Sequence, residues 1–165
     1  MVNCVAELDS LFTYQLVTPE HHDFQALVGE LNASLTRLTQ DSGESSFVAE
    51  EYHADSDRYG VVYVANEPVA CGGFRAYDAQ CAELKRMYSK RPGAGSYLLE
   101  QLHQAAAELG YRRLILSTRR VNQAAVQFYR KHEYQECTPY GKYVGRDVSI
   151  CMSKVCMNKD GIANT

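Results

Sequence analysis

The sequence predicts one α/β domain, residues 1–165, built on a mixed β-sheet. Three observations support this prediction. A chain of 165 residues that is 45% hydrophobic is long enough to bury one sizeable core. Residues 81–117 follow the order strand, turn, helix, strand, which is a βαβ crossover and makes its two strands parallel or near neighbours. Hairpin patterns on both sides of this crossover add antiparallel strands, so we expect both strand directions in the sheet.

Hydrophobic periodicity predicts the elements before the crossover. Residues 11–17 read as a strand, and residues 19–38 carry the spacing of a helix. The polar run DSGESS, residues 41–46, predicts an exposed loop and not a domain linker. Residues 59–65 and 69–76 predict two strands that the turn NEP joins into a hairpin.

The crossover and the C-terminal part follow in order. Residues 81–88 predict a strand, and the apolar positions of residues 96–109 recur at helical spacing until Gly110 ends the helix. Residues 113–117, RLILS, predict the next strand. The remaining elements are a short helix at 122–131, strand segments at 134–137 and 148–154, and a polar tail that we expect to fray from about residue 156.

Composition and the cysteine pattern exclude several classes of protein. No apolar run approaches the roughly 18 residues of a membrane-spanning helix, and the acids in MVNCVAELDS do not fit a secretion signal. The six cysteines include no C-x-x-C pair, so we expect neither a metal site nor a disulfide framework. Cys71 and Cys151, in apolar runs, read as small core residues. Reduced thiols suit the cytoplasm, where we expect this protein.

Charge is distributed unevenly along the chain, although its formal net value is only -3. Residues 1–84 hold three Lys and Arg against fourteen Asp and Glu, whereas residues 85–120 hold eight basic residues against Glu100 and Glu108. These basic residues gather around one turn and do not line a long helical face, so nucleic acid is a poor match. A compact, multiply charged anion fits this segment better.

The basic turn lies in the stretch SKRPGAGSYLLEQL, residues 89–102. A helix that begins at Ser96 leaves its first amides without intrahelical partners and presents a partial positive charge. The two glycines carry no side chains that would keep an anion away, and Lys90 and Arg91 add full charges. Phosphate is one interpretation, and a plain turn with solvated basic residues is another. The Walker and dinucleotide loops do not match, because G-x-x-x-x-G-K-[ST] is absent and the G-x-G lacks its third glycine.

The segments ELKRMY, KRPGAGSYLLEQLHQAAAELGYRRLILST and NQAAVQFYRKHEY occur in an informative order. Together they resemble the GNAT superfamily of acyl-CoA-dependent N-acetyltransferases, with its loop [RQ]-x-x-G-x-[GA] and its later helix N-x-x-A-x-x-x-Y. The resemblance spans about residues 61–154. It implies a splayed, mixed central sheet of about six to seven strands flanked by helices on both faces. It also implies transfer of an acetyl group from acetyl-CoA to a primary amine.

The chain departs from the family pattern in two places. The loop before the helix is shorter than usual and carries Lys90 in place of the first Arg or Gln. His132, Glu133 and Tyr134 stand where Leu-Gly-Phe or Leu-Gly-Tyr is usual. These departures concern the contacts to the pyrophosphate and leave the expected fold unchanged.

The resemblance assigns cofactor roles to individual residues. The backbone of Met87 and Tyr88 would pair with the pantetheine arm as another strand does. Lys90 or Arg91 would screen the pyrophosphate. Asn122 would contact the pantetheine, although a plain N-cap for its helix is an equal interpretation. The amides that would hold the pyrophosphate are those of Gly93, Ala94, Gly95 and Ser96.

Two side chains are candidates for the chemistry of acetyl transfer. An alkylamine with a pKa near ~10.4 is almost all ammonium at neutral pH, so its attack on a thioester needs a base or a water relay. By resemblance the base is Glu83, which could instead be an exposed carboxylate paired with Lys85 or Arg86. Tyr129 matches the acid that protonates the leaving thiolate beside the cofactor, or it is a packed helix aromatic. A backbone amide near Met87 would meet the oxyanion.

The amine that would accept the acetyl group is the part of the reaction that the sequence defines least. Tyr140 and Tyr143, in YGKY, fall where the family covers the acceptor amine, and Arg75 with Arg86 could receive a substrate carboxylate. We therefore expect a small molecule such as an amino acid or a related amine. The acidic run at residues 50–57 could instead attract a polyamine or a basic peptide, or be a solvated loop.

A different class of function also fits these observations. The same fold could bind acetyl-CoA without turnover, as a sensor or partner-binding module, and the short loop favours this alternative. In either case we expect no nucleic acid or membrane partner, and a homodimer is left open.

Overall fold

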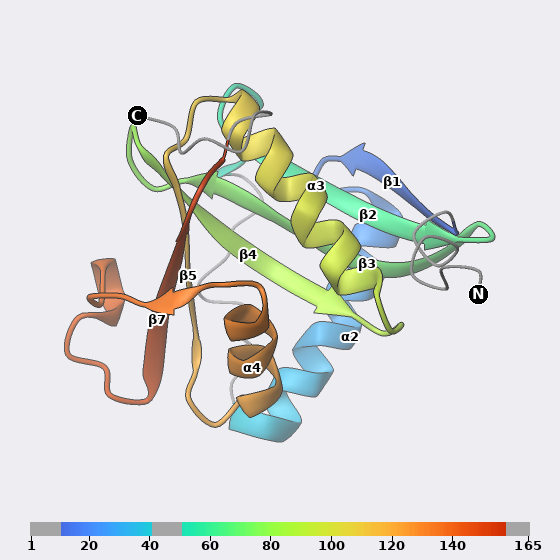
Figure 1. The fold of residues 1–165 in the computed structure, drawn as a ribbon. Coiled ribbons are helices and arrows are strands. Elements are labelled where there is room, and N and C mark those ends of the chain that lie inside the picture. Colours follow the sequence, from blue (N-terminus) through green and yellow to red (C-terminus); the bar gives the residue numbers. More distant parts are fainter. Residues whose placement is uncertain (1–10, 41–50, 158–165) are drawn as a thin grey trace, which may run out of the picture.

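The computed structural model describes residues 11–40 and 51–157. Within these residues, seven strands form one mixed sheet and three α-helices pack on it (Figure 1). The expected loop at 41–46 and most of the expected frayed tail lie outside the described residues. The strands are β1 (Phe12–Val17), β2 (Arg58–Val64), β3 (Glu67–Ala76), β4 (Cys81–Ser89), β5 (Arg113–Arg119), β6 (Gln135–Glu136) and β7 (Ser149–Val155). The helices are α2 (His22–Thr39), α3 (Ala94–Glu108) and α4 (Gln123–Lys131), with a short 3-10 turn, η3 (Gly141–Tyr143).

The strands and helices expected from periodicity all form, with shifts at their ends. Helix α3 begins at Ala94 and not at Ser96. Its N-cap is Gly93, whose left-handed conformation (φ 86°) keeps the helix from extending further back. The strand expected at 134–137 is reduced to β6, since only two of its residues pair with β7. No helix of the described part of the chain is both long and apolar enough to cross a membrane.

The sheet order is β1-β2-β3-β4-β5-β7-β6. The first four strands form an antiparallel meander, β5 runs parallel to β4, and β7 returns antiparallel to β5. The pairing of β4 with β5 covers only residues 81–83 against residues 113–115. The two strands therefore part after Glu83, which confirms the splayed, mixed α/β sheet with helices on both faces.

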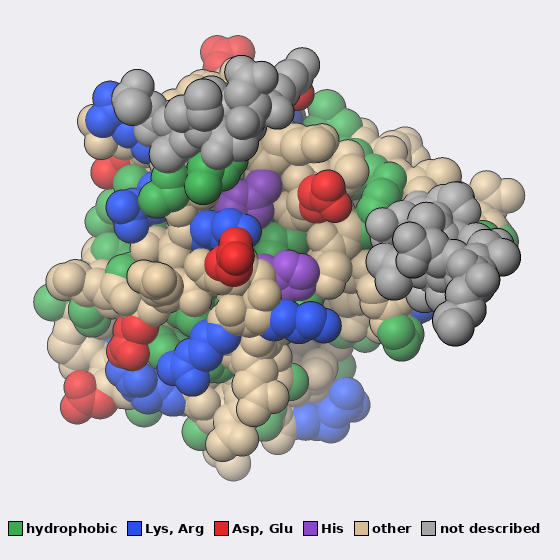
Figure 2. Space-filling view, viewed as in Figure 1, with side chains coloured by type: hydrophobic (Ala, Val, Ile, Leu, Met, Phe, Trp, Pro, Cys, Tyr) green, Lys and Arg blue, Asp and Glu red, His purple; other side chains and the backbone are tan. Residues whose placement is uncertain are grey.

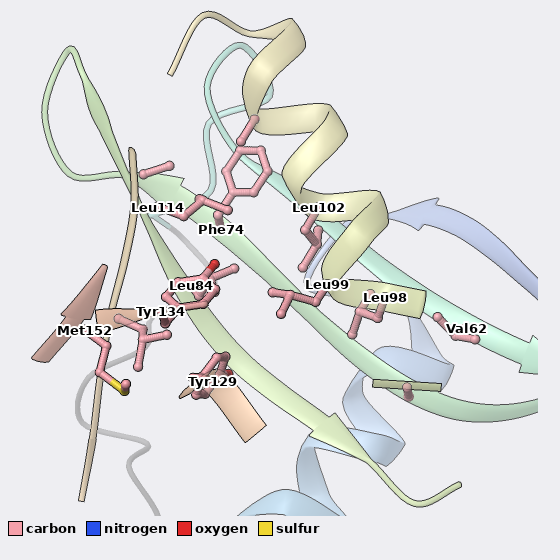
Figure 3. Packing of buried hydrophobic residues seen from close by; sticks show 14 of the residues in the cluster. Val62, Phe74, Leu84, Leu98, Leu99, Leu102, Leu114, Tyr129, Tyr134 and Met152 are labelled. Carbon is pink, nitrogen blue, oxygen red and sulfur yellow. The ribbon is translucent and has the colours of Figure 1, made fainter. Parts of the chain in front are cut away.

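The two faces of the sheet carry separate cores. On one face, α3 buries Leu98 and Leu102 in the same core as Phe74 and Leu84 of the strands (Figure 3). Helix α4 adds Tyr129 to this core. On the other face, Phe24 and its neighbours on α2 pack against β2 and β3. We refer to these faces as the α3 side and the α2 side. Because helices cover both faces of the sheet, the opening where β4 and β5 separate lies between the helix layer of one face and that of the other.

Strand β4 contains a β-bulge at Arg86, next to this opening. Cys71 pairs with Tyr88 and Gly73 pairs with Lys85, so one residue of β3 faces two of β4 between these pairs. Arg86 adopts φ 57°, a left-handed conformation that costs a residue with a side chain on the order of 1–3 kcal/mol. Gly72 lies opposite, where a Cβ would collide with the Met87 sulfur. The glycine thus leaves room for the Met87 side chain at the bulge, just beyond the point where β4 and β5 part.

Candidate active site

A pocket of about 210 Å³ lies where β4 and β5 separate. Its walls are residues 84–87 of β4 and residues 116–119 of β5, with side chains from α2, from α4 and from the segment around η3. Since α4 packs on the α3 side and α2 on the opposite side, the pocket reaches both sides of the sheet. A ligand chain could therefore enter from one side and meet a second molecule from the other.

The first turn of α3 lies at the end of β4, after a basic turn. Gly93 gives the helix no side-chain cap, and the Ala94 amide donates a hydrogen bond of 3.1 Å to the carbonyl of Arg91. The next amides, those of Gly95 and Ser96, are the ones that an anion at this helix end would meet. Arg91 is exposed, whereas the Lys90 ammonium lies 3.2 Å from a carboxylate oxygen of Glu30 on α2. A Cβ on Gly95 would lie 3.3 Å from the Cβ of Ser89. Gly95 therefore also lets α3 approach the end of β4 closely.

Ser96 and His132 form a contact that sequence reasoning missed. The Ser96 hydroxyl and Nε2 of His132 are 2.9 Å apart, which ties the first turn of α3 to the end of α4. Burial lowers the pKa of His132, and the charges of Lys154 and Lys131 lower it further. Histidine side chains lie beside basic ones on this face of the molecule (Figure 2). The signal in the sequence was His132 itself, which replaces the apolar residue usual at this position.

Asn122 and Tyr129 both line the pocket from α4. The Asn122 side chain accepts a hydrogen bond of 3.2 Å from the amide of Ala125, so it caps the helix and faces the pocket at once. Tyr129 is 7% exposed and lies in the core on the α3 side (Figure 3). Its ring packs edge-on against Phe128 and Tyr134. Burial raises the pKa of Tyr129, so the phenol keeps its proton at neutral pH.

Glu83 is buried within a cluster of polar side chains on the α2 side. The Tyr140 hydroxyl donates a hydrogen bond of 2.6 Å to one carboxylate oxygen. The other oxygen lies 3.4 Å from the Lys85 ammonium and 3.5 Å from Nε of Arg75. Glu83 is thus 5% exposed and paired with Lys85 and Arg75. It does not line the pocket itself.

Lys85 connects this cluster to the pocket. It lines the pocket, is 7% exposed and donates a hydrogen bond of 3.2 Å to the Tyr143 hydroxyl. Burial lowers the pKa of Lys85, and the Glu83 carboxylate opposes that shift. Burial and the charge of Glu83 also raise the pKa of Tyr140, which keeps its phenol protonated toward the carboxylate. The cluster therefore places the Glu83 carboxylate between the cations of Lys85 and Arg75 and beside the phenols of Tyr140 and Tyr143.

The residues expected to meet the acceptor divide into two groups. Arg86 and Tyr143 line the pocket, whereas Tyr140 and Arg75 lie behind it. Arg75 bonds to Glu51 at 3.0 Å as well as to Glu83. Lining residues that sequence reasoning did not single out for the pocket include Lys85, Arg119, Lys142 and Arg146.

The fold and the pocket define a class of protein, and a family comparison agrees. The sequence profile of the acetyltransferase (GNAT) family matches residues 24–134, which is more than half of the chain. The chain belongs to the acetyltransferase (GNAT) family. No protein with a curated function gives a sequence match.

Solved structures show the same fold. A Klebsiella pneumoniae protein assigned as an acyl-CoA N-acyltransferase is 22% identical, with a TM-score of 0.77 over 90% of this chain and 99% of that chain. A GNAT family acetyltransferase of Elizabethkingia anophelis, solved with acetyl-CoA bound, is 15% identical, with a TM-score of 0.63 over 88% and 98%. The PaiA N-acetyltransferase of Thermoplasma acidophilum, solved in complex with coenzyme A, is 15% identical, with a TM-score of 0.67 over 87% and 98%.

Proposed function

We propose that this protein transfers an acetyl group from acetyl-CoA to the primary amine of a small molecule. The observation that carries the proposal is the opening between β4 and β5, because it holds a pocket lined by both strands while β4 continues toward the first turn of α3. Membership of the GNAT family and the CoA ligands of two structural neighbours support it. The reaction is direct attack of the amine on the thioester.

Acetyl-CoA would bind mainly through backbone groups. The pantetheine arm would run along Met87 and Tyr88 as an added strand, where β5 has already moved away. The pyrophosphate would lie on the first turn of α3, residues 93–96, with Lys90 or Arg91 beside it. Asn122 and Tyr129 would contact the arm from α4, since both line the opening.

The attacking amine must lose a proton, and Glu83 is the proposed destination. Because its carboxylate lies behind Lys85, we propose that a water relay through the pocket carries the proton to it. As the thioester is attacked, a backbone amide near Met87 stabilises the oxyanion, and the bulge at Arg86 directs β4 toward this role. Tyr129 then protonates the leaving thiolate, which requires the neutral phenol that burial favours.

A binding module without turnover is the second candidate. The observation in its favour is that Tyr140, Lys85 and Arg75 already engage the Glu83 carboxylate. A protein or a polyamine remains the alternative acceptor. We also propose a cytoplasmic location, because the five cysteines in the described residues are free thiols. A homodimer stays a prediction that size-exclusion chromatography with light scattering tests.

Release of CoA thiol from acetyl-CoA tests the proposal. The panel of acceptors covers amino acids, polyamines, aminoglycosides and peptides, and calorimetry measures acetyl-CoA binding in parallel. We expect binding and acceptor-dependent release of thiol with at least one class of small amine. Binding without release across the panel would favour the binding module.

A further inference from the structure

The charged side chains that line the pocket are all basic in the described part of the chain. The lining includes five basic residues, and no Asp or Glu occurs among the described residues that form it. The basic residues come from β4, from the end of β5 and from the segment between β6 and β7. They are Lys85, Arg86, Arg119, Lys142 and Arg146.

This charge lies on the α2 side of the sheet. Leu114 and Leu116 of β5 belong to the core under α3, so Arg119, which alternates with them, points to the α2 side. On β4, Lys85 likewise alternates with the core residue Leu84. The residues of the proposed pyrophosphate site, 89–96, do not line the pocket. The basic residues of the pocket are therefore separate from those expected to meet the phosphates of the cofactor.

Within this set, Lys85 pairs with the Glu83 carboxylate, whereas Lys142 and Arg146 lie on the exposed turn. Glu83 carries one carboxylate, which Lys85 and Arg75 share at 3.4 and 3.5 Å. Lys142 is exposed on η3, with its ammonium 5.5 Å from the centre of the Tyr143 ring, and Arg146 is exposed after the same turn. Burial lowers the pKa of Lys85, and the charges of Arg75 and Lys142 lower it further against the opposing effect of Glu83. The positive charge of Lys142 therefore acts on Lys85, the buried lysine of the pocket lining.

From this arrangement we infer that the acceptor amine carries an anionic group, a carboxylate or a phosphate, that binds Lys142 and Arg146. The inference rests on the proposed acetyl transfer and narrows its substrate class. A cationic acceptor such as a polyamine or a lysine-rich peptide would enter a positive field, with no acid among the described residues that line the pocket. An anionic amine offsets that field while its amino group faces the thioester, and the field also favours the neutral, reactive form of the amine.

Matched acceptors test this inference. The full-length enzyme is assayed for CoA release with alanine, leucine and phenylalanine against their amides, and with 2-aminoethyl phosphate against ethanolamine. The amides hold more free amine at neutral pH, so a preference for the acids cannot arise from reactivity alone. We expect kcat/KM to be at least about tenfold higher for one anionic set, because a charge-assisted hydrogen bond contributes about that much. The two sets distinguish carboxylate from phosphate. Equal rates, or faster turnover of spermidine, would overturn the inference and leave acetyl transfer intact.

Two variants locate the recognition. The double substitution Lys142→Gln with Arg146→Gln should lower kcat/KM for the anionic acceptors through KM and bring the ratio of acid to amide toward one. The control is Arg112→Gln, an exposed residue just before β5 and outside the pocket lining, which should keep the ratio. An unchanged ratio in the double variant would contradict the assignment of these two residues.

A binding measurement decides the inference if no amine is turned over. In that case acetyl transfer itself fails, and the pocket is probed in the CoA-saturated protein by calorimetry with N-acetylleucine and N-acetylleucinamide. Tighter binding of the free acid by at least about tenfold would support anion recognition. Equal or undetectable binding would contradict it.

Discussion

The α3 side and the α2 side of the opening are built in different ways. On the α3 side, the groups proposed to hold acetyl-CoA are mostly backbone groups of neighbouring residues, at the end of β4 and in the first turn of α3. On the α2 side, the polar cluster joins side chains that are distant in sequence: Tyr140 and Glu83 are 57 residues apart, and Lys85 and Tyr143 are 58 apart. The cofactor side therefore depends on local backbone conformation, and the acceptor side depends on how the whole chain folds.

The largest effect that we predict is on the acceptor side. Glu83→Gln keeps an oxygen for the Tyr140 hydroxyl but removes the charge between Lys85 and Arg75. We expect turnover to fall by about 100- to 1,000-fold near neutral pH, because the amine loses its proton acceptor, and to recover partly at higher pH. Acetyl-CoA affinity should change little. Glu136→Gln, in an exposed pair with Arg120, is the control and should be neutral.

Thermal melting of Glu83→Gln across the same pH range separates stability from chemistry. The loss of a buried carboxylate leaves two cations without their shared partner, so some loss of stability is expected. If turnover stayed low at every pH while the protein remained folded, a role as proton acceptor would be contradicted.

A second prediction concerns stability on the α3 side. Nε2 of His103 is 2.6 Å from the hydroxyl of the buried Tyr134. Burial lowers the pKa of His103 most, and the charges of Lys154 and His132 lower it further, to about 4. The unfolded chain binds this proton near a pKa of about 6.5, so stability is complete above that pH and falls as the pH drops toward 4. The loss is at most about 3 kcal/mol. His103→Gln should flatten this dependence in urea unfolding between pH 4 and 7, and an equally steep dependence would show that other groups cause it.

Removing one hydroxyl on the α3 side tests the proposed acid. Tyr129→Phe keeps the ring in its contacts with Phe128 and Tyr134. We expect turnover to fall by about 10- to 100-fold, with affinity for acetyl-CoA and melting temperature close to wild type, because only the leaving thiolate loses its proton donor. Tyr97→Phe on α3 removes a hydroxyl outside the pocket lining and serves as the control. Wild-type turnover in Tyr129→Phe would leave this residue as a packed aromatic.

The smallest predicted effect concerns the backbone of the proposed pyrophosphate site. In Gly95→Val the new side chain meets Ser89 at 3.3 Å and the Phe128 ring at 3.5 Å, so the first turn of α3 must shift. We expect acetyl-CoA affinity to fall by about tenfold, which is about 1.4 kcal/mol, and to fall further as salt rises. Gly29→Val on α2 has open space around it and is the matched control. Calorimetry that finds unchanged affinity in folded Gly95→Val would remove the phosphate site from α3.

The same contrast explains how much could be predicted from sequence. The crossover, the glycine-bearing turn and the helix after it are local patterns, and each forms within one or two residues of its expected place. The start of α3 moved because Gly93 took a left-handed conformation that periodicity alone does not report. The bulge at Arg86 was not expected, since it depends on the register of β3 against β4.

The acceptor side was less predictable for a physical reason. Arg75 and Glu83 face each other directly across the β3–β4 hairpin, so a correct register would have indicated their pairing. Tyr140 and Lys142 reach the pocket region only because β7 returns next to β5 and carries the preceding segment over the α2 side. No local spacing in the sequence encodes that return.

The most direct test follows both products of one reaction. Purified protein, acetyl-CoA and an amine acceptor from the panel are incubated, and released CoA and acetylated amine are quantified together by thiol titration and mass spectrometry. We predict one acetylated amine for each CoA released, with both falling in parallel in Glu83→Gln. CoA release without acetylated amine, or tight binding of acetyl-CoA without either product, would contradict acetyl transfer through this opening.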